Sequence, residues 1–284
     1  MNCVNCETQM EPYFIKRNFE IVRCPRCNLM AVVNAGEDLS KCYTEGYFKG
    51  DTTLDGYMDY DLDKEVSRKT YINILDILSD HLQKQNDISL FEVGCATGFF
   101  MDLARGRGWQ TEGMDISDYA AAKAVEKGLS VTAGSFENFL PAKKYHAVVM
   151  QDLIEHVKDP VGVIKKAGEM LEQNGLLTLT TPDAGSLWAR VMGKRWHAFV
   201  PPQHLFYFSA TNISKMLEKS GFKIIYASHH GKWFTVPYIL RLLYSWTGAG
   251  MFSRFASWTA KSFVKGCAIP INVGDTLFLV ARKM

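Results

Sequence analysis

The sequence lacks a strong charge of either sign. Its 284 residues carry 32 Lys and Arg against 30 Asp and Glu, for a net charge of +2. Chains that bind nucleic acid through a broad surface usually carry a large basic excess. The balance argues against a nucleic-acid partner, and any anion-binding site in this protein must be local.

The sequence also lacks segments that would direct or anchor it to a membrane. No uncharged apolar run reaches the roughly 18 residues needed to span a bilayer. The first residues, MNCVNCETQM, have neither the basic start nor the apolar core of a signal peptide. Repeats are absent, and an apolar fraction of 47% with a charged fraction of 22% is ordinary for a globular protein. We expect a cytoplasmic protein with one large domain and one small one.

Cysteine is present in a pattern that favours metal over disulfides. Of seven cysteines, four form the pairs CVNC and CPRC, seventeen residues apart: Cys3, Cys6, Cys24 and Cys27. Two such knuckles can present four thiolates to one Zn²⁺, and the alternating stretch between them predicts a hairpin. A zinc ribbon over residues 1–35 is the favoured interpretation, with a redox dithiol or a catalytic zinc as alternatives. The remaining cysteines, Cys42, Cys95 and Cys267, are expected to be buried, inert thiols.

Residues 36–82 form an acidic, tyrosine-rich connector that ends in a helix predicted from Val66 to Leu82. Two interpretations stay open for the part before the helix. It is either a solvated linker or a cap whose rings, Tyr57 among them, cover a cofactor.

The stretch SLFEVGCATGFFMDLARGRGW predicts a buried strand at residues 89–93, a tight turn from Gly94 to Gly98 and a helix from Phe99 to Arg105. The glycine spacing fits neither the dinucleotide fingerprint nor a nucleoside-triphosphate loop. Asp115 ends a second strand 21 residues after Gly94, where a carboxylate can accept hydrogen bonds from ribose hydroxyls. Adenosine without phosphates fits this arrangement.

With its acidic residue and glycine turn, EVGCATG resembles the first motif of class I S-adenosylmethionine-dependent methyltransferases, with Ala96 in place of the middle glycine. The resemblance implies a Rossmann-like α/β fold: a seven-stranded sheet with helices on both faces, spanning residues 83–284, with inserts at 183–210 and 231–273. S-adenosylmethionine is the implied cofactor. The resemblance implies these cofactor-binding residues: Glu92, Gly94, Cys95, Ala96, Gly98, Phe99, Asp115, Ile116, Ser135, Phe136, Gln151 and Tyr57.

The stretch QDLIEHV follows the fourth strand of the implied sheet and carries Asp152, Glu155 and His156. If a helix begins there, Asp152 and His156 share one face. The D-x-x-E-H pattern resembles the E-x-x-E-H of ubiquinone-biosynthesis O-methyltransferases, which implies Mg²⁺ on these three residues. A general-base role for His156 and a positioning role are the alternatives.

The insert at 183–210 contains RWHAFVPPQHLFYFS, which resembles a stretch of bacterial methyltransferases encoded beside polysaccharide and nucleotide-sugar genes. The resemblance implies that His204 faces the acceptor, while Trp196 and His197 shape the pocket. Packing of both histidines in an aromatic corner is the alternative.

Residues 231–274 contain five basic residues and no acidic one, together with many aromatic side chains. Three interpretations follow: a membrane-surface contact over 231–268, a wall around a phosphorylated acceptor, or a helical insert that packs on the sheet.

The leading hypothesis is methyl transfer to a hydroxyl of a small-molecule acceptor, a sugar carried on a nucleotide or another phosphate. The alternatives are an RNA methyltransferase that uses its ribbon to grip nucleic acid, and a non-catalytic scaffold that holds S-adenosylmethionine. The oligomeric state is not predicted.

Overall fold

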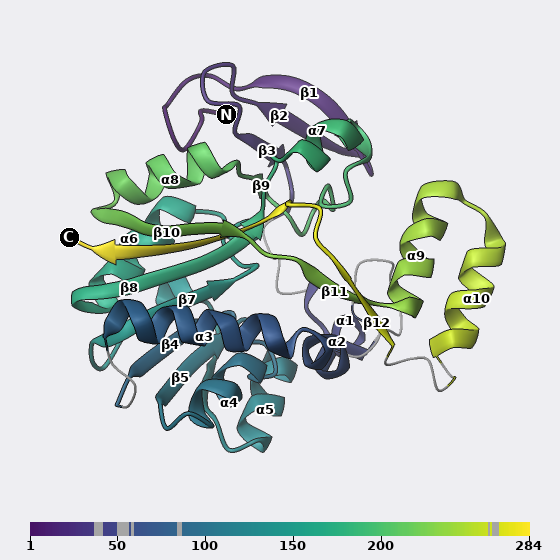
Figure 1. Ribbon diagram of the computed structural model, residues 1–284. Coiled ribbons are helices and arrows are strands. Elements are labelled where there is room, and N and C mark those ends of the chain that lie inside the picture. The colour runs from purple at the N-terminus through teal and green to yellow at the C-terminus, as the bar shows by residue number, and fades with distance from the viewer. Residues whose placement is uncertain (37–41, 50–56, 58–59, 84–86, 261, 263–266) are drawn as a thin grey trace.

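A computed structural model describes residues 1–36, 42–49, 57, 60–83, 87–260, 262 and 267–284. Its centre is a seven-stranded sheet in the order β10-β13-β8-β7-β4-β5-β6, which confirms the predicted fold (Figure 1). The strands are β4 (Ser89–Val93), β5 (Gln110–Asp115), β6 (Ser130–Ala133), β7 (Tyr145–Gln151), β8 (Leu171–Pro182), β10 (Phe222–His229) and β13 (Thr276–Lys283). The five neighbouring strands β8, β7, β4, β5 and β6 run parallel, whereas β13 is antiparallel to both of its neighbours, β8 and β10.

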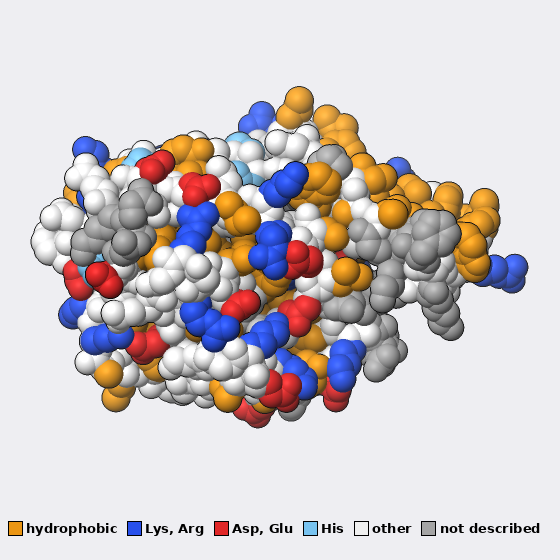
Figure 2. Space-filling model, turned by 60° about the horizontal axis from the view of Figure 1, so that its bottom comes forward, with side chains coloured by type: hydrophobic (Ala, Val, Ile, Leu, Met, Phe, Trp, Pro, Cys, Tyr) orange, Lys and Arg blue, Asp and Glu red, His pale blue; other side chains and the backbone are white. Residues whose placement is uncertain are grey.

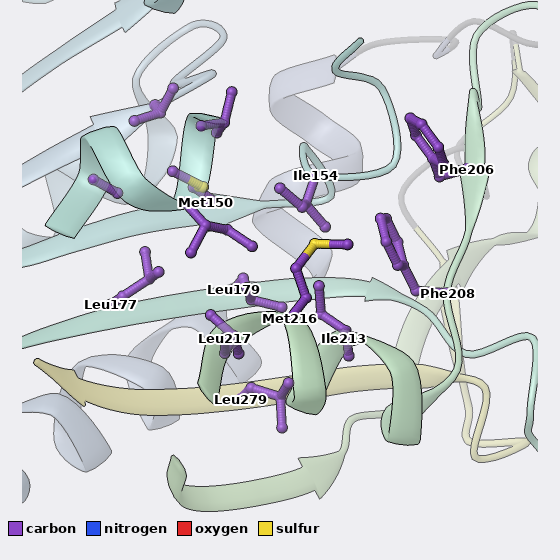
Figure 3. Packing of buried hydrophobic residues seen from close by; sticks show 14 of the residues in the cluster. Met150, Ile154, Leu177, Leu179, Phe206, Phe208, Ile213, Met216, Leu217 and Leu279 are labelled. Atoms are coloured by element: carbon purple, nitrogen blue, oxygen red, sulfur yellow. The ribbon is translucent and has the colours of Figure 1, made fainter. Parts of the chain in front are cut away.

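Helices cover both faces of this sheet, and central strands such as β4 are buried on both sides. The helices are α3 (Arg68–Leu82), α4 (Phe99–Arg105), α5 (Asp118–Glu126), α6 (Pro160–Met170) and α8 (Ala210–Lys219). Along β4, Leu90 packs with α3 and α4, while Phe91 and Val93 belong to the cluster that includes α6 and α8. Figure 3 shows the second cluster, where Met216 and Leu217 meet Leu179 and Leu279.

The N-terminal ribbon (residues 1–35) contains β1 (Glu11–Lys16), β2 (Phe19–Arg23) and β3 (Met30–Val33). The hairpin predicted between the two cysteine pairs is the antiparallel pair of β1 and β2. A fourth strand, β9 (Phe206–Tyr207), completes this sheet by pairing with β3. Because β9 comes from the 183–210 insert, the ribbon and this insert are joined by backbone hydrogen bonds.

The connector contains α1 (Glu45–Lys49) and α2 (Tyr60–Val66), and the helix predicted from Val66 begins at Arg68. The rest of the connector, residues 37–41, 50–56 and 58–59, lies outside the described residues. The 183–210 insert contains α7 (Leu187–Met192) and the short 3₁₀ helix η3 (Gly193–Arg195), and another 3₁₀ turn, η2 (Phe136–Asn138), follows β6.

The insert after β10 is a helical hairpin on a two-stranded base. Its elements are β11 (Lys232–Thr235), α9 (Val236–Thr247), α10 (Gly250–Ala260) and β12 (Ala268–Ile271). The two helices project away from the sheet (Figure 1), so they are not the insert packed on the sheet that one interpretation expected. Lys261 and Lys265 lie outside the described residues. Within the part of the chain that is described, no helix is long and apolar enough to cross a membrane.

Candidate functional site

The glycine turn between β4 and α4 has the backbone that the sequence predicts. Gly94 and Gly98 adopt φ values of 72° and 80°, in the left-handed region that favours glycine. A Cβ atom on Gly98 would also collide with Leu129, and one on Gly94 would lie 2.8 Å from Cδ1 of Leu153. Ala96 takes a φ of 48° between them. The turn therefore presents backbone at the carboxyl end of β4, where ligands bind in parallel sheets.

Asp115 at the end of β5 braces this turn. Its Oδ2 accepts a hydrogen bond from the Ala96 amide at 2.7 Å, and its Oδ1 accepts one from the Ser117 amide at 2.9 Å. Burial raises the pKa of Asp115, and these two amide bonds oppose that rise. Because each carboxylate oxygen can accept a second hydrogen bond, Asp115 can serve ribose hydroxyls as well.

Glu92 lies buried one strand away from Asp115. Its Oε1 accepts a 3.4 Å hydrogen bond from Nε2 of Gln151. Burial raises the pKa of Glu92 well above its usual range; the nearby charge of Lys64 opposes the rise, and that of Asp115 adds to it. A ligand that brings positive charge here would favour the ionised carboxylate.

Lys64 is a residue that the sequence reasoning missed. Its Nζ lies 5.3, 5.0 and 5.7 Å from the ring centroids of Tyr57, Tyr60 and Tyr71. Burial by itself would lower the pKa of Lys64, but the surrounding tyrosine oxygens and Asp152 raise it well above its usual value. The ammonium therefore stays charged inside an aromatic enclosure. The only sequence signal was the i, i+4 spacing of Tyr60 and Lys64, which also fits an ordinary helix face.

The connector packs over the glycine turn, as one of its two interpretations expected. Phe48 is buried against Ala96 and Ala120. The Ser117 hydroxyl donates to the Tyr43 carbonyl at 2.6 Å, and Thr97 donates to Asp61 at 2.5 Å. These contacts make the described part of the connector a cover rather than a solvated linker.

The other predicted cofactor residues have varied surroundings. The Cys95 thiol is buried among Met101, Ala124 and Leu129, so only its backbone faces the turn. Ile116 is exposed beside Asp115, whereas Phe136 is buried in the large core cluster. Ser135 donates to Glu137, and the Phe99 ring lies beside Tyr71 at 5.6 Å. The expectation that all three single cysteines are buried is wrong, because Cys42 is half-buried and Cys267 is exposed.

A cavity of about 600 Å³ adjoins Gln151 at the carboxyl edge of the sheet. This volume falls in the range of ligand-binding sites. Its polar lining includes all four predicted catalytic residues: Asp152, Glu155, His156 and His204. Aromatic side chains from the inserts complete the wall: Trp196, Phe199, Trp233, Phe234 and Tyr238.

The helix expected at residues 152–156 is wrong. This stretch is a turn, Asp152 adopts a φ of 49°, and α6 begins only at Pro160. The turn is held by Thr180, whose backbone oxygen and hydroxyl both accept from the Asp152 amide, at 3.1 and 2.9 Å. These tertiary bonds outweigh the helical spacing of the sequence. Asp152 therefore does not share a helix face with His156.

His156 is oriented by two neighbours. Its Nδ1 lies 2.9 Å from the carbonyl oxygen of Gln203 and 2.8 Å from the hydroxyl oxygen of Tyr43. Because a carbonyl can only accept, Nδ1 carries the hydrogen, and the lone pair of a neutral ring lies on Nε2. Nε2 lies 3.9 Å from Oε1 of Glu155. A ring held this way can accept a proton.

Glu155 and His204 complete the group. Ligand atoms of Glu155, His156 and His204 all lie within 4.8 Å of one another, and the two imidazole rings meet edge-on at 4.7 Å. The other carboxylate oxygen of Glu155 accepts from Thr181 at 2.9 Å. In the described part of the chain, the group that could hold a cation here has His204, not Asp152, as its third member.

Backbone hydrogen bonds explain how His204 arrives at this place. The Glu155 carbonyl accepts from the amides of Leu205 and Phe206, at 2.7 and 3.1 Å. Further back in the insert, the Trp196 indole donates to Asp275 at 2.9 Å, and Nε2 of His197 lies 3.6 Å from the same carboxylate. Trp196 and His197 thus line the cavity while being tied to the framework.

The four ribbon cysteines converge as their spacing predicts. The Sγ atoms of Cys3 and Cys27 lie 3.5 Å apart, those of Cys6 and Cys24 3.4 Å, and those of Cys6 and Cys27 3.8 Å. A tetrahedron of thiolates about 2.3 Å from Zn²⁺ has edges of roughly 3.8 Å. The donor set and its spacing fit this ion.

Residues 60–227 match a family model described as a methyltransferase domain. Curated relatives include the ubiquinone biosynthesis O-methyltransferase of Bradyrhizobium diazoefficiens, 25% identical over 166 residues, which are 51% of this chain and 65% of the relative. The protein of the same name from Actinobacillus pleuropneumoniae is 26% identical over 35% of this chain and 49% of its own length. The chain thus spans between about half and two thirds of these relatives.

Solved structures with the same fold include a magnesium protoporphyrin IX methyltransferase from Synechocystis. It has a TM-score of 0.52 and 15% identity, over 84% of this chain and 91% of that one. A possible histamine N-methyltransferase from Thermotoga maritima has a TM-score of 0.50 and 19% identity, over 77% of this chain and 91% of that one. At these identities the likeness concerns the fold.

Proposed function

This chain belongs to the methyltransferase domain family, and on that premise we propose that it transfers a methyl group from S-adenosylmethionine to a hydroxyl of a small-molecule acceptor. One observation carries the proposal. The braced glycine turn of Asp115 and Ala96 opens at the same sheet edge as the cavity that holds Glu155, His156 and His204. A cofactor site and an acceptor site side by side are what methyl transfer requires.

The proposed roles follow from the contacts. Bound S-adenosylmethionine supplies a methyl group already activated on a sulfonium. Asp115 holds the ribose hydroxyls, and Glu92 provides negative charge for the methionine end. His156 accepts the proton of the acceptor hydroxyl at Nε2 as the new carbon–oxygen bond forms, and Glu155 stabilises the resulting imidazolium. His204 positions the acceptor across from His156.

For the acceptor we propose a sugar hydroxyl, on a sugar linked to a nucleotide or another phosphate carrier. The mixture of aromatic and polar side chains around the cavity suits a sugar ring. A quinol is the second candidate, because the curated relatives are named for ubiquinone biosynthesis and the aromatic wall suits a flat ring as well.

Zinc in the ribbon is part of the proposal. The sulfur spacing of Cys3, Cys6, Cys24 and Cys27 supports it, and four protein ligands leave no position for catalysis, so the role is structural. A magnesium ion on Asp152, Glu155 and His156 is not part of the proposal, because Asp152 lies outside the group of converging ligand atoms among the described residues.

The remaining alternatives receive less support. An RNA acceptor would call for a phosphate-binding track that a net charge of +2 does not supply. A scaffold that only binds S-adenosylmethionine would leave the cluster of Glu155, His156 and His204 without a purpose.

The deciding experiment has two parts. Calorimetry measures S-adenosylhomocysteine binding to the wild type and to Asp115→Ala, for which we expect affinity to fall about tenfold or more because a charged hydrogen-bond partner is lost. A turnover assay then measures S-adenosylhomocysteine release with a panel of nucleotide sugars and quinols. Unchanged binding in Asp115→Ala would overturn the cofactor site, and release with quinols alone would replace the sugar by the second candidate.

A further inference from the structure

The ribbon contributes directly to the wall of the acceptor cavity. Lys16 and Arg17, at the tip of the β1–β2 hairpin, line it together with Arg195 of η3. From this convergence we infer that the ribbon contributes to recognition of the acceptor. Lys16, Arg17 and Arg195 form a cationic rim that binds a diphosphate group. The inference rests on the proposed function for the acceptor's chemistry and gives the ribbon a role beyond stability.

The rim is fixed relative to the reacting groups. Nζ of Lys16 donates to the Lys194 carbonyl at 3.3 Å, which ties the hairpin tip to the residue before Arg195. The Phe14 and Phe199 rings pack edge-on at 5.0 Å below the tip. Further along, the Val32 amide donates to the Leu205 carbonyl at 2.9 Å. A rigid distance between a cationic rim and His204 would select acceptors by the spacing of their anionic group and their hydroxyl.

The backbone at the tip supports a role for the Arg17 side chain. Arg17 and Asn18 form a two-residue turn with φ values of 50° and 66°. Such turns favour Asn and Gly, which adopt positive φ easily, so Asn18 is ordinary and Arg17 is not. An arginine in a position that favours glycine carries a conformational cost that a side-chain function would explain.

Three of the cations that line the cavity lie together on the ribbon and the insert. These are Lys16, Arg17 and Arg195, and the two arginines are exposed. The acids Asp63, Asp152 and Glu155 come from α2 and the 152–156 turn, and α2 also contributes the cation Lys64. Burial, and then the charge of Arg17, lower the pKa of Lys16. A bound anion would relieve that repulsion, and guanidinium groups match phosphate oxygens in geometry.

The test uses inorganic pyrophosphate and uridine diphosphate as probes, with citrate as a non-phosphate anion. Arg17→Gly is the informative variant, because glycine suits the turn and keeps the hairpin while removing the charge. We expect Arg17→Gly and Arg195→Ala each to weaken pyrophosphate and uridine diphosphate binding about tenfold. Arg23→Ala, on the same ribbon but outside the cavity lining, should bind as the wild type does.

S-adenosylhomocysteine affinity, measured on the same variants, separates this inference from the proposed function. It should not change in Arg17→Gly or Arg195→Ala. Three results would overturn the inferred cationic rim, even if the enzyme binds its cofactor and turns over. They are a lack of diphosphate binding, equal diphosphate binding by the wild type and Arg17→Gly, and citrate binding as tight as pyrophosphate binding. Conversely, diphosphate binding without S-adenosylhomocysteine binding would overturn the proposed function and leave the rim standing.

Discussion

Nδ1 of His156 and the carbonyl oxygen of Gln203 lie 2.9 Å apart, and this hydrogen bond joins the two halves of the candidate catalytic group, together with the backbone bonds from Leu205 and Phe206 to the Glu155 carbonyl. It fixes the ring of His156 and places the residue after Gln203, His204, beside it. Edge-on contact of the two rings at 4.7 Å is the result. The segment Gln203–His204 therefore both orients the ring of His156, which accepts the proton, and places His204, which positions the acceptor.

The first prediction concerns this pair. His156→Ala should lower kcat by about 100-fold to 10,000-fold, the usual contribution of a general base, with little change in S-adenosylhomocysteine affinity. His204→Ala should chiefly raise KM for the acceptor, because we place it as a positioning residue. Assays that are quenched at set times and measure S-adenosylhomocysteine release give both kcat and KM. His81→Ala, outside the cavity lining, is the control. Full turnover in His156→Ala would show that alignment alone drives the reaction.

The second prediction concerns Glu92 and pH. Burial raises the pKa of Glu92 in the folded chain, so the native state holds this proton more tightly than the unfolded state does. The raised pKa of Glu92 therefore has no effect on the free energy of unfolding below the unfolded pKa of about 4.3. As pH rises above that value, it destabilises the folded chain. Glu92→Gln should match the wild-type Tm near pH 4 and exceed it at pH 8.

The same substitution should act oppositely on the cofactor. Positive charge from S-adenosylmethionine favours ionised Glu92, so Glu92→Gln should weaken binding about tenfold at pH 8 while raising the Tm of the cofactor-free chain. Thermal melts and calorimetry across pH give both readouts, with the exposed Glu218→Gln as the matched control. A lower Tm at pH 8 would show that Glu92 is instead held ionised by Lys64.

The third prediction concerns zinc. Chelation, or Cys24→Ser, should lower the Tm and reduce turnover, since β3 of the ribbon pairs with β9, which follows His204 closely. Metal analysis of the purified protein should give about one zinc per chain if the four thiolates bind one ion. Cys267→Ser, at an exposed thiol away from the cluster, should change neither quantity. An unchanged Tm after complete zinc removal would show that the ribbon folds without metal.

The sequence predicts best where structure is decided locally. Strand 89–93 and helix 99–105 have the observed bounds, because the apolar run, the glycines and the helix pattern are contiguous. It fails at 152–156, where hydrogen bonds from the Asp152 amide to Thr180 impose a turn on a helical spacing. It also gives no sign of β9, two residues long, whose partner β3 lies far away in the sequence.

The candidate site shows the same division. His156 and His204 could be assigned to one sheet edge by counting strands. That His204, and not Asp152, lies beside Glu155 and His156 depends on tertiary contacts. Lys64 could not be found because only the folding of Tyr57 and Tyr71 around it distinguishes it from a surface lysine. Patterns in the sequence place elements, whereas side-chain convergence depends on the loops between them.

The last prediction concerns the projecting hairpin, for which we propose contact with an anionic membrane surface. Met251, Phe255 and Trp258 of α10 are 58%, 53% and 64% exposed, and with Arg254 they share one helix face. Apolar side chains gather on this end of the molecule (Figure 2), and residues 231–274 contain no acid that would repel anionic lipid. The combination of exposed apolar side chains and basic charge is typical of helices that lie in a membrane interface.

Vesicle co-sedimentation tests this surface. The wild type should bind phosphatidylglycerol-containing vesicles and not pure phosphatidylcholine, with binding reduced by salt because Arg254 attracts the anionic headgroups. The double variant Phe255→Ser and Trp258→Ser should lose most of this binding. Leu187→Ser on α7, where an even more exposed apolar side chain lies on a different element, should retain it. Concentration-dependent dimers that the double variant abolishes, without any vesicle binding by the wild type, would instead assign α10 to contact between two copies of the chain.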